Sequence, residues 1–445
     1  MSNLFYQTKS PRPMLDRAEG IYMWDKSGKR YIDGSSGAMV SNIGHSNPKV
    51  LAAMRAQMEK STFGYRLHFQ TEASETLAAK VAELAPAAMN KVFFVSGGSE
   101  AVESCLKLAR QYVLTQGQAQ RFKVISRYPS YHGSTLGALA ITGYAPMSAP
   151  FDPMMQRMPK VPAPRAYLDG LDANDPATGL HYANMLEAKI LEEGPETVLA
   201  FIVEPVGGAS TGALVPPAGY MRRIREICSQ YGVLLIHDEV MTGGGRTGRF
   251  FGAEHWDVVP DIIAISKGFG GCYVPLGAMI ARDDIVEAVM QGGGFINGFT
   301  YAGNPLACAA GCAVLDEIAA QDLTANAARM GEALAMRLRG LMQRYPLIGD
   351  VRGKGLLAAF ELMADRHTKD PLPAHLNAHA RLVDIAYDNG LIIYSRRTRG
   401  GTSGDHFLVC PPMIVTEAQL DDITQRLDQS LASYMAEIPQ FSGVA

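Results

Sequence analysis

The sequence predicts an α/β fold in which helices cover a mostly parallel sheet, together with a smaller α+β unit. Short, continuous apolar runs alternate with helix-like segments through most of the chain, which is typical of parallel sheets buried on both faces. After residues 306–345, which are rich in helical patterns, strands and helices follow one another in a different order. With 445 residues, the chain is long enough for two or three folding units.

The first predicted elements are a hairpin and an amphipathic helix. Residues 20–34 predict the hairpin, because alternating apolar residues flank a Lys-Ser-Gly-Lys turn. Residues 71–85 predict the helix, with Leu77, Val81 and Leu84 on one face. Both patterns are typical of elements that pack one face against a core.

Five apolar runs are the predicted strands of the buried sheet. They are residues 91–95, 123–126, 198–203, 233–237 and 261–266. A helix over residues 99–113 follows the first run and turns Val102, Cys105 and Ala109 inward. Residues 145–180 are rich in proline and glycine without a clear period, so we expect a long loop there.

The smaller unit is predicted from the end of the chain together with the N-terminal hairpin. Its expected elements are residues 348–362, a helix near 375–389, strands at 390–395 and 406–410, and a helix over 416–435. We therefore expect a large domain over residues 61–320 and a small domain formed by residues 1–60 and 321–445.

Composition excludes several classes of protein. Apolar residues make up 47% and charged residues 19%, which argues against disorder, collagen and coiled coils. The net charge of −3 offers no strong field for nucleic acid or anionic lipid. The chain start has no signal-peptide pattern, and no apolar stretch approaches the roughly 20 residues that span a bilayer. The six cysteines are scattered without a CxxC pair, so we expect no disulfide scaffold and a cytoplasmic location.

The ends of the predicted strands carry the candidate chemistry, because ligands of open parallel sheets bind beyond the carboxyl ends of the strands. Residues 96–99 (Ser-Gly-Gly-Ser) follow the first strand and open a helix. Free N–H groups and the helix dipole favour an anion there, and glycine lets the backbone approach it closely. The simpler alternative is an ordinary helix cap at Ser99.

Three further strand ends carry side chains of different chemistry. Asp238 follows the run 233–237, and a carboxylate at a buried strand tip needs a partner. Lys267 follows 261–266 and suits an amine nucleophile, although a solvated cap is the simpler interpretation. Tyr131 follows 123–126 and suits stacking on a flat ligand or simple packing. An anion cradle, an aromatic plate, a carboxylate and a lysine together match the needs of pyridoxal phosphate.

Seven motifs make the chain resemble the class III pyridoxal-phosphate-dependent aminotransferases of fold type I, from about residue 15 to 435. They are SGGSEAVE (96–103), SYHG (130–133), EP (204–205), HDEVMTGGGRTG (237–248), SKGFGG (266–271), FTYAGNP (299–305) and VRGKGL (351–356). The resemblance implies a large domain with a mostly parallel, seven-stranded sheet covered by helices. It also implies a smaller α+β domain built from both termini.

The resemblance also implies the roles of individual residues. Lys267 is expected to form the Schiff base with the cofactor, and Asp238 to pair with its pyridine nitrogen. The remaining cofactor-binding residues are Gly98 and Ser99 at the phosphate, Tyr131 and Val240 at the two ring faces, His132, and Glu204. Thr300, after Phe299, is expected to reach the phosphate of the neighbouring subunit. This implies a homodimer with shared active sites, and a dimer of dimers is left open.

The expected substrates follow from the stretch after Glu204. Relatives that use 2-oxoglutarate commonly carry a glutamate where this chain has Ala209. The resemblance therefore implies transfer from an ω-amino acid or primary amine to a keto acid, most simply pyruvate, by a ping-pong mechanism. Arg396 or Arg399 is expected to bind the carboxylate in bidentate fashion, and Met39 to lie at the pocket entrance.

Several alternatives stay open at this stage. The same fold could support a 2-oxoglutarate-dependent aminotransferase of the 4-aminobutyrate type, an aminomutase or a racemase. Residues 243–248 match the glycine pattern of dinucleotide-binding oxidoreductases, but no clear helix follows them. His375 and His379 have helical spacing, yet a solvated helix face explains them better than a metal site, and we expect no metal. An inactive binding module is the last alternative.

Overall fold

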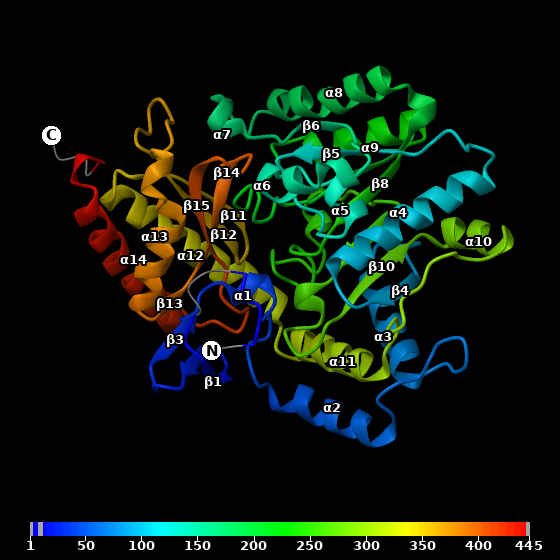
Figure 1. Cartoon of the computed structure of the whole chain (residues 1–445), viewed down its shortest axis with the longest axis horizontal. Helices are drawn as coiled ribbons and strands as arrows, with labels where there is room; N and C mark the ends of the chain where they lie inside the picture. Colours follow the sequence, from blue (N-terminus) through cyan, green and yellow to red (C-terminus); the bar gives the residue numbers. More distant parts are fainter. Residues whose placement is uncertain (1–2, 8–11, 442–445) are drawn as a thin grey trace.

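The computed structural model describes residues 3–7 and 12–441. It contains one large sheet flanked by helices and two small sheets that lie beside it (Figure 1). Within the described residues, no helix is long and apolar enough to cross a membrane.

The large sheet has seven strands in the order β4-β10-β9-β8-β7-β5-β6. They are β4 (Lys91–Val95), β5 (Lys123–Tyr128), β6 (Lys160–Pro162), β7 (Val198–Val203), β8 (Leu234–Asp238), β9 (Ile262–Ile265) and β10 (Gly277–Ala281). Strand β10 is antiparallel to both of its neighbours, whereas β9, β8, β7, β5 and β6 pair in parallel. This confirms the predicted mostly parallel α/β sheet.

Helices cover both faces of this sheet because its central strands are apolar on both sides. In β8, Leu234 and Ile236 pack into the cluster with α4, while Leu235 packs into the cluster with α8 and α9. The flanking helices are α3 (Glu72–Leu84), α4 (Gly98–Thr115), α8 (Pro176–Glu193), α9 (Tyr220–Tyr231), α10 (Asp283–Gln291) and α11 (Pro305–Ala320). Alternation along the strand thus divides the core into two layers.

The two small sheets combine strands from the beginning and the end of the chain. One sheet has the order β1-β2-β3-β13, and the other β11-β12-β15-β14. Their strands are β1 (Leu15–Glu19), β2 (Tyr22–Asp25), β3 (Arg30–Asp33), β11 (Ile348–Lys354), β12 (Leu357–Leu362), β13 (Leu391–Ile392), β14 (Tyr394–Arg399) and β15 (Ser403–Val409). Strand β13 pairs in parallel with β3, so the two ends of the chain share a sheet.

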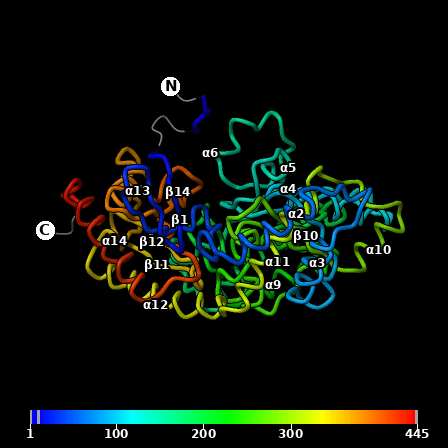
Figure 2. The backbone as a smooth tube through the Cα atoms, turned by 90° about the horizontal axis from the view of Figure 1, so that it is seen from below, coloured from blue at the N-terminus to red at the C-terminus, as the bar shows by residue number. Residues whose placement is uncertain are grey.

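Helices of the C-terminal part pack beside these sheets. They are α12 (Leu323–Arg344), α13 (Ala378–Asp388) and α14 (Glu417–Glu437). The N-terminal helix α2 (Pro48–Lys60) instead packs against α11 of the large-sheet part. Figure 2 shows the N-terminal strands beside the C-terminal elements in a second view. The domain boundaries after residues 60 and 320 stay a prediction.

Residues 145–180 differ from the predicted long loop. The segment contains the short helices α6 (Ala145–Ser148) and α7 (Ala166–Asp169), a 3₁₀ turn, the edge strand β6 and the start of α8. Strand β6 has only three residues and ends at Pro162, so it is too short to produce a periodic pattern. The loop prediction was therefore wrong for the sheet edge.

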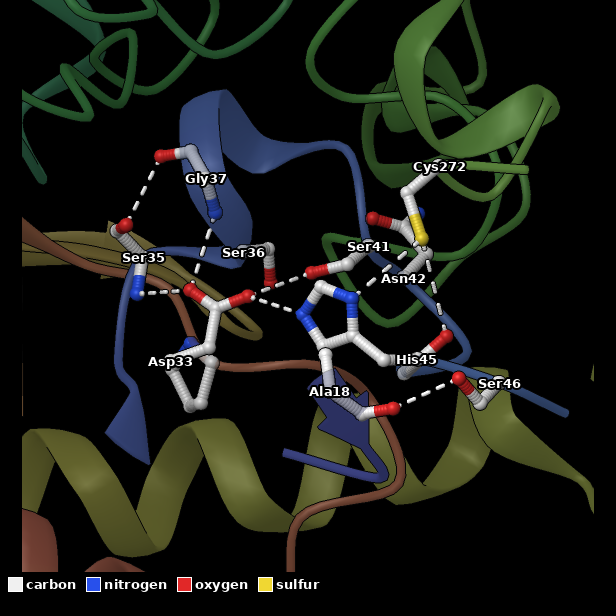
Figure 3. Close-up of polar contacts among 12 residues, drawn as sticks. Ala18, Asp33, Ser35, Ser36, Gly37, Ser41, Asn42, His45, Ser46 and Cys272 are labelled. Carbon is white, nitrogen blue, oxygen red and sulfur yellow. Dashed lines mark hydrogen bonds and ion pairs between the residues drawn. The ribbon is translucent and has the colours of Figure 1, made fainter. Parts of the chain in front are cut away.

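A buried carboxylate fixes the loop that follows β3. Asp33 is 1% exposed and accepts hydrogen bonds from His45 Nε2 at 3.0 Å, Ser41 Oγ at 2.8 Å and the Gly37 N–H at 3.0 Å (Figure 3). Burial by itself raises the pKa of Asp33, but these hydrogen bonds hold it below its usual range. The hydrogen bond to Asp33 raises the pKa of His45 to about 9.

This pair makes stability depend on pH. The folded chain keeps the His45 proton up to about pH 9, whereas the unfolded chain releases it near its ordinary value of 6.5. The stabilisation is therefore complete below pH 6.5 and is lost as the pH rises through 9, by roughly 3 kcal/mol at most. We expect the thermal midpoint to fall more between pH 6 and pH 9.5 in the native chain than in His45→Gln. His367 is exposed, so His367→Gln serves as the control. If the thermal midpoint fell equally with pH in the native chain and in His45→Gln, His45 would not be the source of the pH dependence.

Candidate active site

A cavity of about 140 Å³ lies where five strands of the large sheet end. Its walls come from the segments that follow β4, β5, β7, β8 and β9. The lining residues are Gly98, Ser99, Tyr131, His132, Gly133, Glu204, Val206, Asp238, Val240, Met241 and Lys267. The structure thus brings together the predicted cradle, aromatic residue, carboxylate and lysine.

The cradle is the first turn of α4, which begins at Gly98 with Gly97 as its cap rather than at Ser99. Glycine is required at position 98, because an added Cβ would lie 2.9 Å from Val240 Cγ1. The carboxylate of Glu100 turns back to accept the Ser96 N–H at 2.8 Å. The Glu100 carboxylate is therefore hydrogen-bonded to the backbone. The first N–H groups of the 18-residue helix α4 lie at the cavity wall, where they can bind an anion.

Asp238 presents the carboxylate of the site. Its Oδ2 lies 2.8 Å from His132 Nδ1, and its Oδ1 accepts the Val240 N–H at 3.0 Å. His132 is buried, and its Nε2 has no hydrogen-bond partner among the described residues. This histidine fixes the orientation of the carboxylate, as outer partners of catalytic groups commonly do. The following Glu239 faces elsewhere and accepts the N–H groups of Gly252 and Ala253 at 2.8 Å.

Glu204 is a second carboxylate in the cavity wall. Glu204 accepts the Gly208 N–H at 3.0 Å, and its Oε2 lies 3.7 Å from Arg127 Nη2. Burial raises the pKa of Glu204, while the charges of His132 and Arg127 oppose that rise. Arg127, buried in β5, is a site residue that the sequence reasoning missed. An arginine inside an apolar strand was the available signal.

Lys267 lies two residues after the end of β9 and has a backbone φ of +49°. The N–H groups of Gly270 and Gly271 donate to its carbonyl and hold this turn at 3.0 and 3.2 Å. Burial lowers the pKa of Lys267, and the negative charges of Asp238 and Glu204 oppose the shift. A lowered pKa makes the free amine, which is the nucleophilic and basic form, more available.

A second cavity of about 200 Å³ adjoins the first and shares Tyr131, Met241 and Lys267 with it. Its other lining residues are Ala38, Met39, Tyr144, Met147, Ala209, Ser210, Tyr394 and Arg396. Met39 is 2% exposed and therefore forms part of the wall rather than an open entrance. Tyr144 and Tyr394 were not predicted, because neither comes from a periodic segment near a large-sheet strand.

Arg396 is the arginine that reaches this pocket. Its guanidinium lies over the Tyr394 ring at 4.6 Å from the centroid, and within the described chain no carboxylate is in ion-pair distance of it. Arg399 lines neither cavity and instead donates to the Lys369 carbonyl. The structure therefore brings one of the two predicted arginines to the site.

Thr300 and Phe299 do not line the cavity of a single chain. Thr300 is exposed, and Phe299 is half-buried against the cluster that includes α4 and α10. Within the described residues, no group of acidic, histidine and cysteine side chains has the arrangement of a metal site. His375 lies in the 3₁₀ turn Ala374–Leu376 and His379 lies in α13, so the two do not share one helix, and His379 Nδ1 is 3.0 Å from Asp405 Oδ1.

The glycine pattern of residues 243–248 serves a structural purpose. It forms consecutive turns without a following helix. Within it, the buried Arg246 donates to the Pro411 carbonyl at 2.5 Å and to Asn42 Oδ1 at 2.6 Å. Arg246 thus joins the loop after β3 to the C-terminal part, and the dinucleotide interpretation has no support here.

The residues of the first cavity fit pyridoxal phosphate. Gly98 and Ser99 in the first turn of α4 line this cavity, and the free N–H groups of that turn suit the phosphate. Asp238 is a buried carboxylate with an oriented histidine behind it, which suits a protonated ring nitrogen. Lys267 lines the same cavity as Gly98 and Asp238.

Comparison with known proteins places this site in a family. The family model for class-III aminotransferases matches residues 6–431, and the chain belongs to that family. It is therefore a transaminase that depends on pyridoxal phosphate.

Three relatives show the breadth of the family around this chain. It is 35% identical to the putrescine–pyruvate aminotransferase of Pseudomonas aeruginosa, over 95% of this chain and 92% of the relative. It is 36% identical to the diaminobutyrate–2-oxoglutarate transaminase of Halomonas elongata, over 96% and 92% of the two chains. The omega-transaminase of Pseudomonas jessenii, solved in complex with PMP, is 33% identical with a TM-score of 0.92, over 99% of this chain and 98% of that one.

Proposed function

We propose that this enzyme moves an amino group from an ω-amino acid or a primary amine to pyruvate, by a ping-pong mechanism. When bound, the cofactor accepts electrons from the substrate carbon and carries the amino group between the two substrates. Side chains and backbone groups of the protein bind the cofactor and move the proton. Lys267 takes and returns the proton at that carbon, Asp238 holds the ring nitrogen, and Gly98 and Ser99 hold the phosphate.

The observation that carries the acceptor proposal is the number of cations in the two cavities. Among the described lining residues, Lys267 and Arg396 are the only cationic side chains besides histidine. Lys267 is needed for proton transfer, which leaves one guanidinium for one carboxylate. Pyruvate has one carboxylate, whereas 2-oxoglutarate has two and would leave the second beside apolar walls such as Met39 and Met241.

The donor proposal rests on the same arginine. An ω-amino acid can place its amine at Lys267 and its distant carboxylate on Arg396 in bidentate fashion. An amine without a carboxylate is also accommodated, because Arg396 is exposed and can turn to solvent. The small side chain of Ala209 lines the pocket without a carboxylate that would hold the arginine. The putrescine–pyruvate relative agrees with this choice, and the diaminobutyrate–2-oxoglutarate relative represents the competing one.

Arg396→Ala tests this assignment. We expect the KM for pyruvate to rise at least tenfold, since a charge-assisted bond to a carboxylate is lost. The half-reaction with a primary amine that lacks a carboxylate is expected to change by less than threefold. The measurements are alanine formation from pyruvate and glutamate formation from 2-oxoglutarate. A native enzyme that prefers 2-oxoglutarate over pyruvate would contradict the acceptor proposal, and a larger effect from Arg399→Ala would contradict the role of Arg396.

We also propose that the enzyme is a homodimer whose partner completes the phosphate site through Thr300. Large apolar side chains are exposed on two neighbouring segments, including Phe63 at 47%, Leu67 at 74% and Tyr301 at 64%. The Phe63 and Tyr301 rings are in contact, and Arg66 donates to the Asn297 carbonyl at 3.1 Å. Such a patch is typical of an interface. Light scattering of the purified protein distinguishes a monomer from a dimer or a dimer of dimers.

A further inference from the structure

Cys272 lies outside the active site but beside His45, a titratable residue from a distant part of the chain. Its Sγ is 3.9 Å from His45 Nδ1 and 3.9 Å from the Gly44 carbonyl (Figure 3). His45 Nε2 in turn lies 3.0 Å from Asp33 Oδ2. The Cys272 thiol, the His45 imidazole and the Asp33 carboxylate therefore contact one another in this order. These contacts connect the loop after β9 with the loop after β3.

The orientation of the imidazole is fixed by its carboxylate partner. Asp33 is buried and is held by Ser41 and the Gly37 N–H in addition to His45. Because the pKa of His45 is raised to about 9, its ring is an imidazolium at neutral pH. Both ring nitrogens then carry a proton, and the Nδ1–H faces the Cys272 sulfur across 3.9 Å.

The other cysteines lack this environment. Cys105, Cys228, Cys308 and Cys410 are buried, whereas Cys272 is exposed. Burial raises the pKa of Cys228 and Cys308 to about 12 and that of Cys410 to about 11. Cys312 is partly buried, and burial raises its pKa to about 11. One thiol of the described chain therefore combines exposure with an adjacent cation.

We propose that Cys272 is a modification site for low-molecular-weight disulfides, and that an adduct there acts on the substrate pocket. The Cys272 sulfur bonds to one sulfur of the disulfide, the disulfide bond breaks, and the other sulfur leaves with the proton that the thiol gives up. The modifying disulfide is the oxidant, and it is reduced to one free thiol. A thiol reductant reverses the exchange.

The coupling to the pocket runs through Asp33. The carboxylate holds both Gly37 and Ser41, and Met39 of the pocket wall lies between these two residues. An adduct on Cys272 that displaces His45 removes one donor from this carboxylate and loosens the loop that carries Met39. Cys272 also lies in the turn after Lys267, where the Gly271 N–H donates to the Lys267 carbonyl.

The first test measures thiol reactivity of the holoenzyme with the coloured reagent 5,5′-dithiobis(2-nitrobenzoate). We expect one thiol per chain to react rapidly, and Cys272→Ser to abolish this phase. Cys312→Ser is the matched control and is expected to retain it. His45→Gln is expected to slow the phase at least tenfold. The proposal is overturned if no thiol reacts in the native holoenzyme, if Cys272→Ser keeps the rapid phase, or if folded His45→Gln reacts within twofold of the native rate.

The second test measures the consequence for the pocket. Holoenzyme treated with oxidised glutathione is expected to show at least a threefold higher KM for the amine donor, reversed by a thiol reductant. Cys272→Ser treated in the same way is expected to show no change, and the mass of the glutathione adduct confirms modification of the native chain. A modified enzyme with an unchanged KM would overturn the coupling. Because thiol release is read independently of transamination, this result is distinguishable from a wrong substrate assignment.

Discussion

Replacing Lys267 with alanine lowers the rate of amino transfer by about four orders of magnitude or more, because the substitution removes both the nucleophilic amine and the group that moves the substrate proton. Lys267 is the only lysine among the residues that line the two described cavities, so no neighbouring amine can substitute for it. The measurement is kcat with saturating amine and keto acid, together with the cofactor content of the variant.

The control for this prediction is Lys26→Ala, because Lys26 is exposed in the turn between β2 and β3. Its rate is expected to stay within twofold of the native rate. A Lys267→Ala variant that retains more than 1% of native kcat in the presence of cofactor would show that another group moves the proton.

Replacing Asp238 with asparagine lowers kcat by roughly 10²–10³-fold, as expected when one preorganised electrostatic partner is lost. The amide preserves the shape and can still accept the Val240 N–H, but it carries no negative charge for the ring nitrogen. The electron-accepting capacity of the ring depends on that charge. Steady-state kinetics and the affinity for the cofactor are the measurements, and both are expected to weaken.

Asp257→Asn is the matched control for the aspartate substitution. Asp257 is exposed and has a φ of +52°, a conformation that asparagine tolerates well. We expect native kinetics from this variant. If Asp238→Asn also kept native kcat, the carboxylate would be a structural partner of His132 and not of the cofactor.

The central part of the site was predictable because each residue follows a strongly apolar strand. Asp238 is the last residue of β8, Lys267 lies two residues after the end of β9, and Gly98 opens the helix after β4. In a parallel sheet such positions meet at one edge, so sequence order alone brings them together. Once the strands are recognised, little further information is needed to bring these side chains to one cavity.

The choice between Arg396 and Arg399 required the structure. Side chains alternate across β14, so Arg396 lies on the face of the pocket while Arg397 and Arg399 lie on the other face. Arg397 contacts Asp405 at 3.4 Å on that other side. The number of strand residues before the turn decides which arginine faces the substrate, and the turn sequence alone does not fix that number.

The group around Asp33 had no signal in the sequence. Asp33, His45 and Cys272 lie far apart along the chain, and each is an ordinary residue in its local segment. They meet because the N-terminal loop packs against the turn after Lys267, and Asn42 of the same loop donates to the Gly244 carbonyl at 3.0 Å. Tertiary packing of separate segments, rather than any local pattern, creates this arrangement.

The most direct test of the account is the position of the covalent link between chain and cofactor. Holoenzyme is reduced with borohydride, digested, and analysed by mass spectrometry for the peptide that carries the pyridoxyl group. The account predicts the modification on Lys267 in the native enzyme and its absence in Lys267→Ala. A modification on any other lysine of the native enzyme, or on none, would contradict it.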